Sequence, residues 1–194
     1  MTINIKNFLS SKNKMSKMGE FQNLKQIDGL EMSASSADLY KNGRDDLVLF
    51  YFKNGANYAS VNTTNSIVSE SISWNNNSHK KLIKGLLVNT KNANTFTGKQ
   101  GKESLDILAK NLSRILTLKE SKSDEGTSET IKIKDLLFAS TGVIGEEFPV
   151  EQIKDALPGL VSKLKTQHNK LYWLKMASGM MTTDTRPNVA YEEI

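Results

Sequence analysis

The sequence has no cysteine, only two histidines and only three prolines among its 194 residues. Without cysteine, disulfides, thiolate nucleophiles and cysteine-ligated metal sites are excluded. His79 and His168 lie far apart, and neither belongs to a closely spaced ligand pair, so no metal site is predicted. The histidines also form no interpretable Ser-His-Asp arrangement, and no GxSxG turn occurs. The common nucleophile and base pairs of hydrolases are therefore not indicated.

Long hydrophobic runs are missing as well. No apolar segment approaches the roughly 20 residues that cross a bilayer, so no membrane span is predicted. Residues 1–18 carry lysines but no acidic residue, which can mimic a targeting segment, yet they contain no arginine and no secretory-type apolar stretch. We interpret residues 1–27 as a loosely ordered N-terminal extension and residues 28–194 as part of one domain.

Arginine is scarce, since only Arg44, Arg114 and Arg186 are present. The net charge of +5 therefore comes almost entirely from lysines, which alternate with acidic residues along the chain. A nucleic-acid interface favours arginine and interleaved aromatics on one face, so we predict a solvated lysine surface and no nucleic-acid partner. The GKQGK segment at residues 98–102 lacks the spacing of a phosphate loop, which disfavours a nucleotide hydrolase.

Apolar patterning predicts an α/β fold. Residues 43–52 and 56–61 flank Asn54-Gly55, a pair typical of tight turns, and together predict a β-hairpin. Residues 82–88 predict a buried strand. Residues 103–118 carry one apolar stripe at helical spacing, and further helices are predicted after Pro149 and over residues 171–181. Residues 119–130 predict an exposed connection before residues 131–138 return to the core.

Two polar loops follow the predicted strands. The segment STGVIG at residues 140–145 has two glycines that allow the backbone to approach a ligand closely. The loop after the strand at 82–88 is rich in asparagine, a residue that often organises backbone locally. We interpret its polar residues as structural rather than as ligands: Asn89, Asn92, Asn94, Thr97 and Gly98.

Three segments in this order resemble the glutamate N-acetyltransferase (ornithine acetyltransferase) family of arginine biosynthesis: LLVNTKNANTFTGKQG at 86–101, ASTGVIG at 139–145 and MTTDTRP at 181–187. Weaker similarities, GRDDLVL at 43–49 and NTTN at 62–65, extend the resemblance over most of the chain. The resemblance implies the N-terminal, α-chain part of a layered αββα sandwich. In this family a precursor cuts itself before an internal threonine.

The resemblance also implies a mechanism. The α-amino group of the new terminal threonine serves as base for its own hydroxyl, which removes the need for histidine. The acetyl group passes from N-acetylornithine to this threonine and then to glutamate, through tetrahedral oxyanions. By resemblance, Thr141 and Gly142 form the oxyanion hole, and Thr182 binds substrate.

Further expectations come from the same resemblance. They are a C-terminal β chain as partner, an α2β2 heterotetramer, a cytoplasmic location, no metal or nucleotide cofactor, and acetyl-CoA as a second acetyl donor in bifunctional members. The sequence stops at Ile194, before the family's substrate-binding lysine and nucleophilic threonine. We therefore expect this chain alone to be inactive and to expose unpaired sheet edges and apolar area.

Two other functions stay open at this point. A non-catalytic binding or scaffold protein could use the same fold without the chemical step. A self-processing aminopeptidase or amidase could share the fold and the terminal nucleophile but release its acyl group to water.

Overall fold

A computed structural model describes residues 24–77, 82–122, 129–166 and 169–190. His79 and His168 lie outside these residues, as do residues 1–23 of the predicted extension. Four strands form one sheet in the order β1-β2-β3-β4. The elements in chain order are β1 (Leu30–Ser35), β2 (Leu47–Asn57), α2 (Glu70–Asn77), β3 (Leu82–Asn89), α3 (Gly98–Glu120), the 3-10 helix η1 (Ile133–Asp135), β4 (Leu136–Ser140), α4 (Val150–Ser162) and α5 (Lys170–Gly179).

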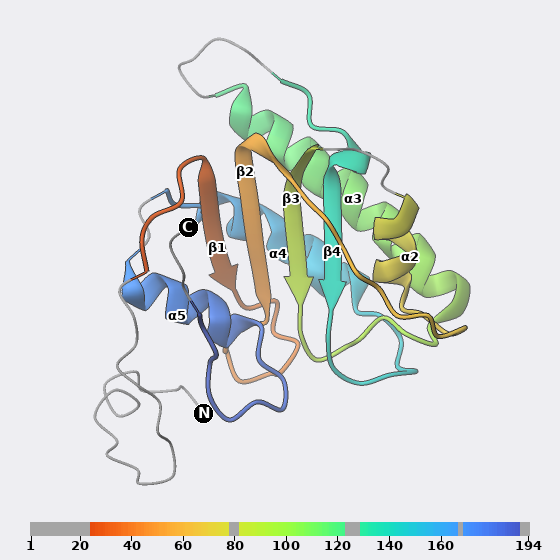
Figure 1. Ribbon diagram of the computed structural model, residues 1–194. Helices are drawn as coiled ribbons and strands as arrows, with labels where there is room; N and C mark the ends of the chain where they lie inside the picture. Colours follow the sequence, from red (N-terminus) through yellow and green to blue (C-terminus); the bar gives the residue numbers. More distant parts are fainter. Residues whose placement is uncertain (1–23, 78–81, 123–128, 167–168, 191–194) are drawn as a thin grey trace, which may run out of the picture.

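At one end of the sheet, the ends of all four strands lie next to one another (Figure 1). β2 pairs antiparallel with β1 and β3, and β3 pairs parallel with β4 across the α3 connection. Ser35 lies opposite Leu47, Leu47 opposite Asn89, and Asn89 opposite Ser140. The β1–β2 connection and the loops that follow β3 and β4 therefore begin side by side.

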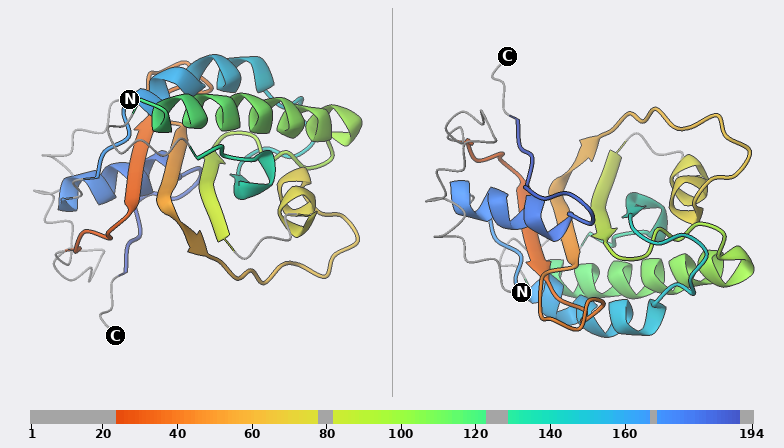
Figure 2. Two further views of the ribbon diagram at one scale, coloured as in Figure 1. Left: turned by 90° about the horizontal axis from the view of Figure 1, so that it is seen from above. Right: turned by 90° about the horizontal axis from the view of Figure 1, so that it is seen from below.

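Alternation along the strands divides the core into two layers. Leu47, Leu49 and Tyr51 of β2 pack in the cluster that contains the buried faces of α3 and α4. Val48 packs in a second cluster, which includes Met176 of α5. Figure 2 shows α3 and α4 on one side of the sheet and α5 on the other. The predicted α/β class is confirmed, and so are the helices predicted within α3, α4 and α5.

The predicted β-hairpin is wrong. Residues 47–57 form one strand, β2, which stays paired with β3 on both sides of an irregularity. Tyr51 pairs with Gly85 and Ala56 with Ile83, so the four residues 52–55 lie opposite the single residue Lys84. Asn54-Gly55 thus forms part of a bulge, in which Gly55 takes a φ of 75°. Pairing with distant strands on both sides has overridden the local turn signal.

The expectation of unpaired sheet edges is wrong for β4 and, on β1, at Met32. On β4, the Asn75 side chain of α2 accepts from Phe138 N (3.0 Å) and donates to Phe138 O (2.8 Å), as a neighbouring strand would. Trp74 Nε1 donates to Leu136 O over 2.9 Å. On β1, Met32 and Lys165 exchange two backbone hydrogen bonds of 3.1 Å. The helix α2 and residue Lys165 therefore occupy much of the room that an added strand would need.

The strand β1 and the helix α2 are not among the elements predicted from the sequence. The alternation of LEMSAS was a strand signal for β1, since Leu30, Met32 and Ala34 share one face. The short helix α2 has little amphipathic pattern, and it depends on its contacts with β4. Among the described helices, none is both long and apolar enough to cross a membrane. The second sheet of the expected αββα sandwich is not formed by the described residues and stays a prediction.

Candidate functional site

The turn after β4 lies directly against the loop after β3. Thr141 N donates to Asn89 O (3.1 Å), and Val143 N donates to Lys91 O (2.8 Å). In return, Ala93 N donates to Val143 O over 2.9 Å. A further bond of 2.8 Å joins Gly145 N to Thr95 O. The two segments therefore extend the β3–β4 pairing past the end of the sheet, and this fixes the path of residues 141–145.

Gly142 is the point of closest approach between these segments. Its φ is 136°, a value that side-chain-bearing residues rarely adopt. A Cβ at this position would also overlap the carbonyl carbon and oxygen of Lys91. The second residue of the Thr-Gly pair must therefore be glycine for backbone reasons alone, whatever its role towards a ligand.

The Thr-Gly turn has three hydrogen-bond donors: the Thr141 N–H, the Thr141 hydroxyl and the Gly142 N–H. The Thr141 N–H is used by Asn89 O, so it is not free to bind a ligand. Within the part of the chain that the structure describes, neither the Thr141 hydroxyl nor the Gly142 N–H donates a hydrogen bond. Gly142 is exposed and Thr141 is half-buried. These two groups come from adjacent residues, and both are available to a ligand.

Buried asparagines hold the two loops together. Asn89 Oδ1 accepts from the Ser140 hydroxyl (2.7 Å), and Asn89 Nδ2 donates to Asn92 O (3.0 Å). Asn92 Nδ2 donates to the carbonyls of Glu146 and Glu147. Asn92 Oδ1 accepts from Asn94 N over 2.8 Å. The prediction that these asparagines organise the loops beside the Thr-Gly turn is confirmed.

The start of α3 is joined to this network. Asn94 Nδ2 donates to Gly101 O (3.2 Å), and its Oδ1 accepts from the Thr97 hydroxyl (2.7 Å). A Cβ on Gly101 would come within 2.3 Å of Asn94 Oδ1 and would also overlap the Thr97 side chain. Glycine at 101 therefore lets the first turn of α3 close onto Asn94.

Thr182 lies in a different part of the molecule. It follows the end of α5, directly after the buried Met181, and is itself half-buried. The segment after α5 runs to the same end of the sheet as the Thr141 turn (Figure 1). Among the described residues, no hydrogen bond joins Thr182 to Thr141 or Gly142. The structure thus brings two of the three predicted site residues together and places the third on the α5 side.

Comparison with known proteins identifies the family. A family model described as the ArgJ family matches residues 31–194. The chain belongs to the ArgJ family. The arginine biosynthesis bifunctional protein ArgJ of Bartonella quintana is 30% identical over 170 residues, which cover 87% of this chain and 37% of that protein. Its namesake in Caulobacter vibrioides is 31% identical over 175 residues, or 88% of this chain and 39% of that protein.

Solved structures share the fold. The crystal structure of arginine biosynthesis bifunctional protein argJ from Bacillus halodurans superimposes with a TM-score of 0.69 at 21% identity, over 84% of this chain and 80% of that one. Ornithine acetyltransferase from Mycobacterium tuberculosis, complexed with ornithine, gives a TM-score of 0.72 at 20% identity, over 86% and 82%. The resemblance seen in the sequence motifs is therefore confirmed at the level of family and fold. The chain spans between 37% and 39% of the length of the two curated relatives named above.

One buried acid of this ArgJ-family chain was not recognised from the sequence as part of the site. Asp46 is fully buried directly before β2, and its carboxylate accepts from Ala37 N (2.6 Å) and Leu39 N (2.8 Å). Burial raises the pKa of this carboxyl, and the two backbone hydrogen bonds oppose the rise. Its carbonyl accepts from Thr90 N over 3.0 Å, which joins the β1–β2 connection to the loop after β3. The signal in the sequence was a paired acid, Asp45-Asp46, directly before a strongly apolar strand.

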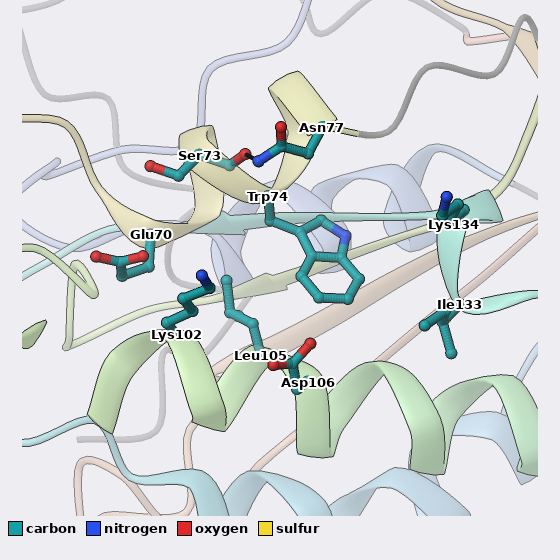
Figure 3. Close-up of a pocket in the computed structure, with 9 residues that line it drawn as sticks. All are labelled: Glu70, Ser73, Trp74, Asn77, Lys102, Leu105, Asp106, Ile133 and Lys134. Atoms are coloured by element: carbon teal, nitrogen blue, oxygen red, sulfur yellow. Dashed lines mark hydrogen bonds between the residues drawn. The ribbon is translucent and has the colours of Figure 1, made fainter. Parts of the chain in front are cut away.

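A cavity of about 470 Å³ lies between α2, α3 and η1, with the Trp74 ring projecting between the two helices (Figure 3). Two acidic groups and two lysines balance its charge, so it has no clear preference for a ligand of either sign. It lies apart from the three predicted site residues, and its lining is Glu70, Ser73, Trp74, Asn77, Lys102, Leu105, Asp106, Ile133 and Lys134.

Proposed function

We propose that this chain is the N-terminal part of an acetyltransferase of arginine biosynthesis that moves the acetyl group of N-acetylornithine to glutamate. Membership of the ArgJ family supports a role in arginine biosynthesis. The ornithine-bound ornithine acetyltransferase with the same fold supports the substrate class. The proposed reaction uses neither a metal nor a nucleotide, and acetyl-CoA can act as a second acetyl donor if the protein is bifunctional.

The observation that carries this proposal is the Thr141-Gly142 turn. Its backbone is locked against the loop after β3, and its two unused donors, the Thr141 hydroxyl and the Gly142 N–H, lie at the exposed end of the sheet. Acyl transfer develops negative charge on the carbonyl oxygen, and fixed donors aimed at that oxygen stabilise the transition state. A donor pair held by backbone hydrogen bonds needs no reorganisation when the charge appears.

The remaining chemistry requires a nucleophile outside the described residues. We propose a threonine at the start of a C-terminal β chain, as in the family that the motifs resemble. Its hydroxyl attacks the acetyl carbonyl of N-acetylornithine while its α-amine takes the proton, and the ornithine amine leaves with that proton. The glutamate amine then attacks the acetyl-threonine, forms N-acetylglutamate and regenerates the hydroxyl. Assembly as an α2β2 heterotetramer in the cytoplasm belongs to the same proposal.

The test is acetyl transfer by the protein expressed from its complete coding sequence. With N-acetylornithine and glutamate, N-acetylglutamate should form faster than free acetate. Thr141→Ala should lower kcat by about 100-fold, because one oxyanion donor is lost, and Thr141→Ser should keep most of the activity. The exposed Thr166 supplies a matched control, since Thr166→Ala should leave kcat unchanged.

Two results would contradict the proposal. If acetate were released faster than it is transferred, a hydrolase of the same fold would be the better assignment. If Thr141→Ala kept kcat within about twofold while melting like the wild type, the turn would not be an oxyanion hole, since such donors contribute far more.

A further inference from the structure

The GRDDL segment resembles the family but has no part in the chemistry described above. Its first four residues, 43–46, end the connection between β1 and β2 (residues 36–46), at the end of the sheet where the loops after β3, β4 and α5 also lie (Figure 1). Two of its residues contact different neighbours, one through its side chain and one through its backbone. The Arg44 side chain reaches the end of α5, and the Asp46 carbonyl accepts from Thr90 N in the loop after β3. The Asp46 carboxylate stays within the connection, where it accepts from Ala37 N and Leu39 N.

Arg44 contacts the chain directly before Thr182. Its Nη2 atom donates to Met181 O over 2.5 Å and to Ser178 O over 3.4 Å. The guanidinium also lies over the Tyr40 ring, 4.3 Å from the centroid, which limits its choice of positions. Because a peptide group is planar, a bond to Met181 O also orients the N–H and Cα of Thr182.

Few other polar contacts fix this end of α5. Lys175 Nζ lies 3.6 Å from Asp45 Oδ2, but both side chains are substantially exposed, and such pairs contribute little. Gly179 packs closely against Val48, which sets the distance of the helix from the sheet but not the orientation of the residues that follow. The amides of Met180 and Met181 donate to Ala177 O and Ser178 O, and the Met181 side chain is buried. Within the part of the chain that the structure describes, Arg44 is the side chain that binds the Met181 carbonyl, which belongs to the Met181–Thr182 peptide.

The opposite side of the same connection is anchored to the Thr-Gly half of the site. Asp46 O accepts from Thr90 N and from the Thr90 hydroxyl, over 3.0 and 3.4 Å. Lys91 Nζ donates to Leu39 O over 2.6 Å. Lys91 is also the residue whose backbone packs against Gly142. A continuous set of hydrogen bonds thus runs from the Gly142 loop through residues 36–46 to Met181.

We propose that Arg44 is a positioning residue that sets Thr182 relative to the Thr141-Gly142 turn, by binding the Met181 carbonyl from a loop anchored to Thr90 and Lys91. The proposal rests on the proposed role of Thr182 in substrate binding. The contacts of Arg44 are with the carbonyls of Ser178 and Met181 and with the Tyr40 ring, so in this proposal it acts through Thr182. An exposed arginine on α3, Arg114, serves as the matched control.

The structural part is tested by hydrogen exchange on the protein from its complete coding sequence. In Arg44→Ala, the amides of Met180 and Met181, which donate to Ala177 O and Ser178 O, should exchange about tenfold faster or more, as expected for the loss of a charge-assisted hydrogen bond. The strands β2 and β3, and all amides in Arg114→Ala, should exchange as in the wild type. Unchanged exchange of Met180 and Met181 in Arg44→Ala would overturn the proposal. This readout decides the role of Arg44 even if the protein shows no acetyl transfer, a result that would count against the proposed function alone.

The functional part is tested by a double-mutant cycle. Arg44→Ala should raise KM for N-acetylornithine about tenfold while kcat changes much less, because a binding contact and not the oxyanion hole is disturbed. Arg44→Lys should restore most of the lost affinity, since an ammonium can donate to the same carbonyl. In a Thr182→Ala background, Arg44→Ala should raise KM by less than about twofold. Fully additive effects on KM would show that Arg44 acts independently of Thr182 and would overturn the proposal.

Discussion

The Thr141 half of the candidate site and the Thr182 half are held in different ways. Four backbone hydrogen bonds and three buried asparagines fix the Thr-Gly turn against the loop after β3. The Thr182 segment follows a helix end and is oriented by one half-exposed side chain, Arg44. Backbone ladders tolerate little change in geometry, whereas a single long side chain can follow small movements.

This difference suits the two proposed tasks. Oxyanion donors must be in place before charge develops, because any reorganisation would subtract from the stabilisation that they give. A substrate-binding threonine has to admit and release a ligand, so a more adjustable support is tolerated. Substitutions that act on one half and not on the other should reveal the difference.

The largest effect is expected at Gly142. Gly142→Ala introduces a Cβ against the Lys91 backbone at a φ of 136°, so the two loops must separate. We expect a loss of about 3 kcal/mol in the free energy of unfolding, measured by urea denaturation, together with loss of acetyl transfer. A loss below about 1 kcal/mol would show that the turn is more adjustable than its hydrogen bonds indicate.

A smaller loss is expected at Asn92. Asn92→Ala leaves Asn94 N and two loop carbonyls without the partners that this buried side chain supplied. We expect about 2 kcal/mol of destabilisation in the same denaturation experiment. Asn111, whose amide donates to Ile107 O within α3, gives the matched control, and Asn111→Ala should stay within about 0.5 kcal/mol. Equal effects at the two asparagines would argue against a special role of the loop network.

In the Thr182 half of the site, Gly179 is the glycine at a close contact, as Gly142 is in the Thr141 half. A Cβ at Gly179 would lie 2.8 Å from Val48 Cγ2, so it meets a side chain and not a backbone. We expect Gly179→Ala to lower the free energy of unfolding by only about 1 kcal/mol, because α5 can shift by a few tenths of an ångström. Adding Val48→Ala should recover part of that loss, which a thermal melt of both single variants and the double variant would show. Additive losses would mean that the contact does not limit the position of α5.

The smallest effect is expected from Asp46, on the pH dependence of the free energy of unfolding. The folded pKa of Asp46 is raised above the ordinary value of 3.8, so the folded protein binds more protons than the unfolded chain between the two values. In that window the contribution of Asp46 makes stability fall as pH rises, by less than about 1.4 kcal/mol per pH unit. Asp46→Asn should remove this contribution and make the measured slope of the free energy of unfolding against pH more positive. An unchanged slope would show that the hydrogen bonds from Ala37 and Leu39 cancel the effect of burial.

Much of the candidate site could be located from the sequence, since its parts follow elements with clear periodicity. The apolar run of β3 placed Asn89 at a strand end, and the run before Ser140 placed the Thr-Gly turn at another. Arg44 could not be found in this way. Its partners, Ser178 and Met181, lie 134 and 137 residues away and offer only backbone carbonyls, which every residue has.

Local chemistry in the sequence determined the amphipathic helices, the two core faces of β2 and the need for glycine near residue 142, because each depends on spacing or on backbone freedom within a few residues. Tertiary structure alone decided that Asn54-Gly55 becomes a bulge within a long strand, and that Asn75 of α2 takes the place of a fifth strand beside Phe138. It also decided that Arg44 binds the carbonyl of Met181, directly before Thr182. These outcomes depend on which distant segments pair, and that choice minimises the free energy of the whole chain, not of any one segment.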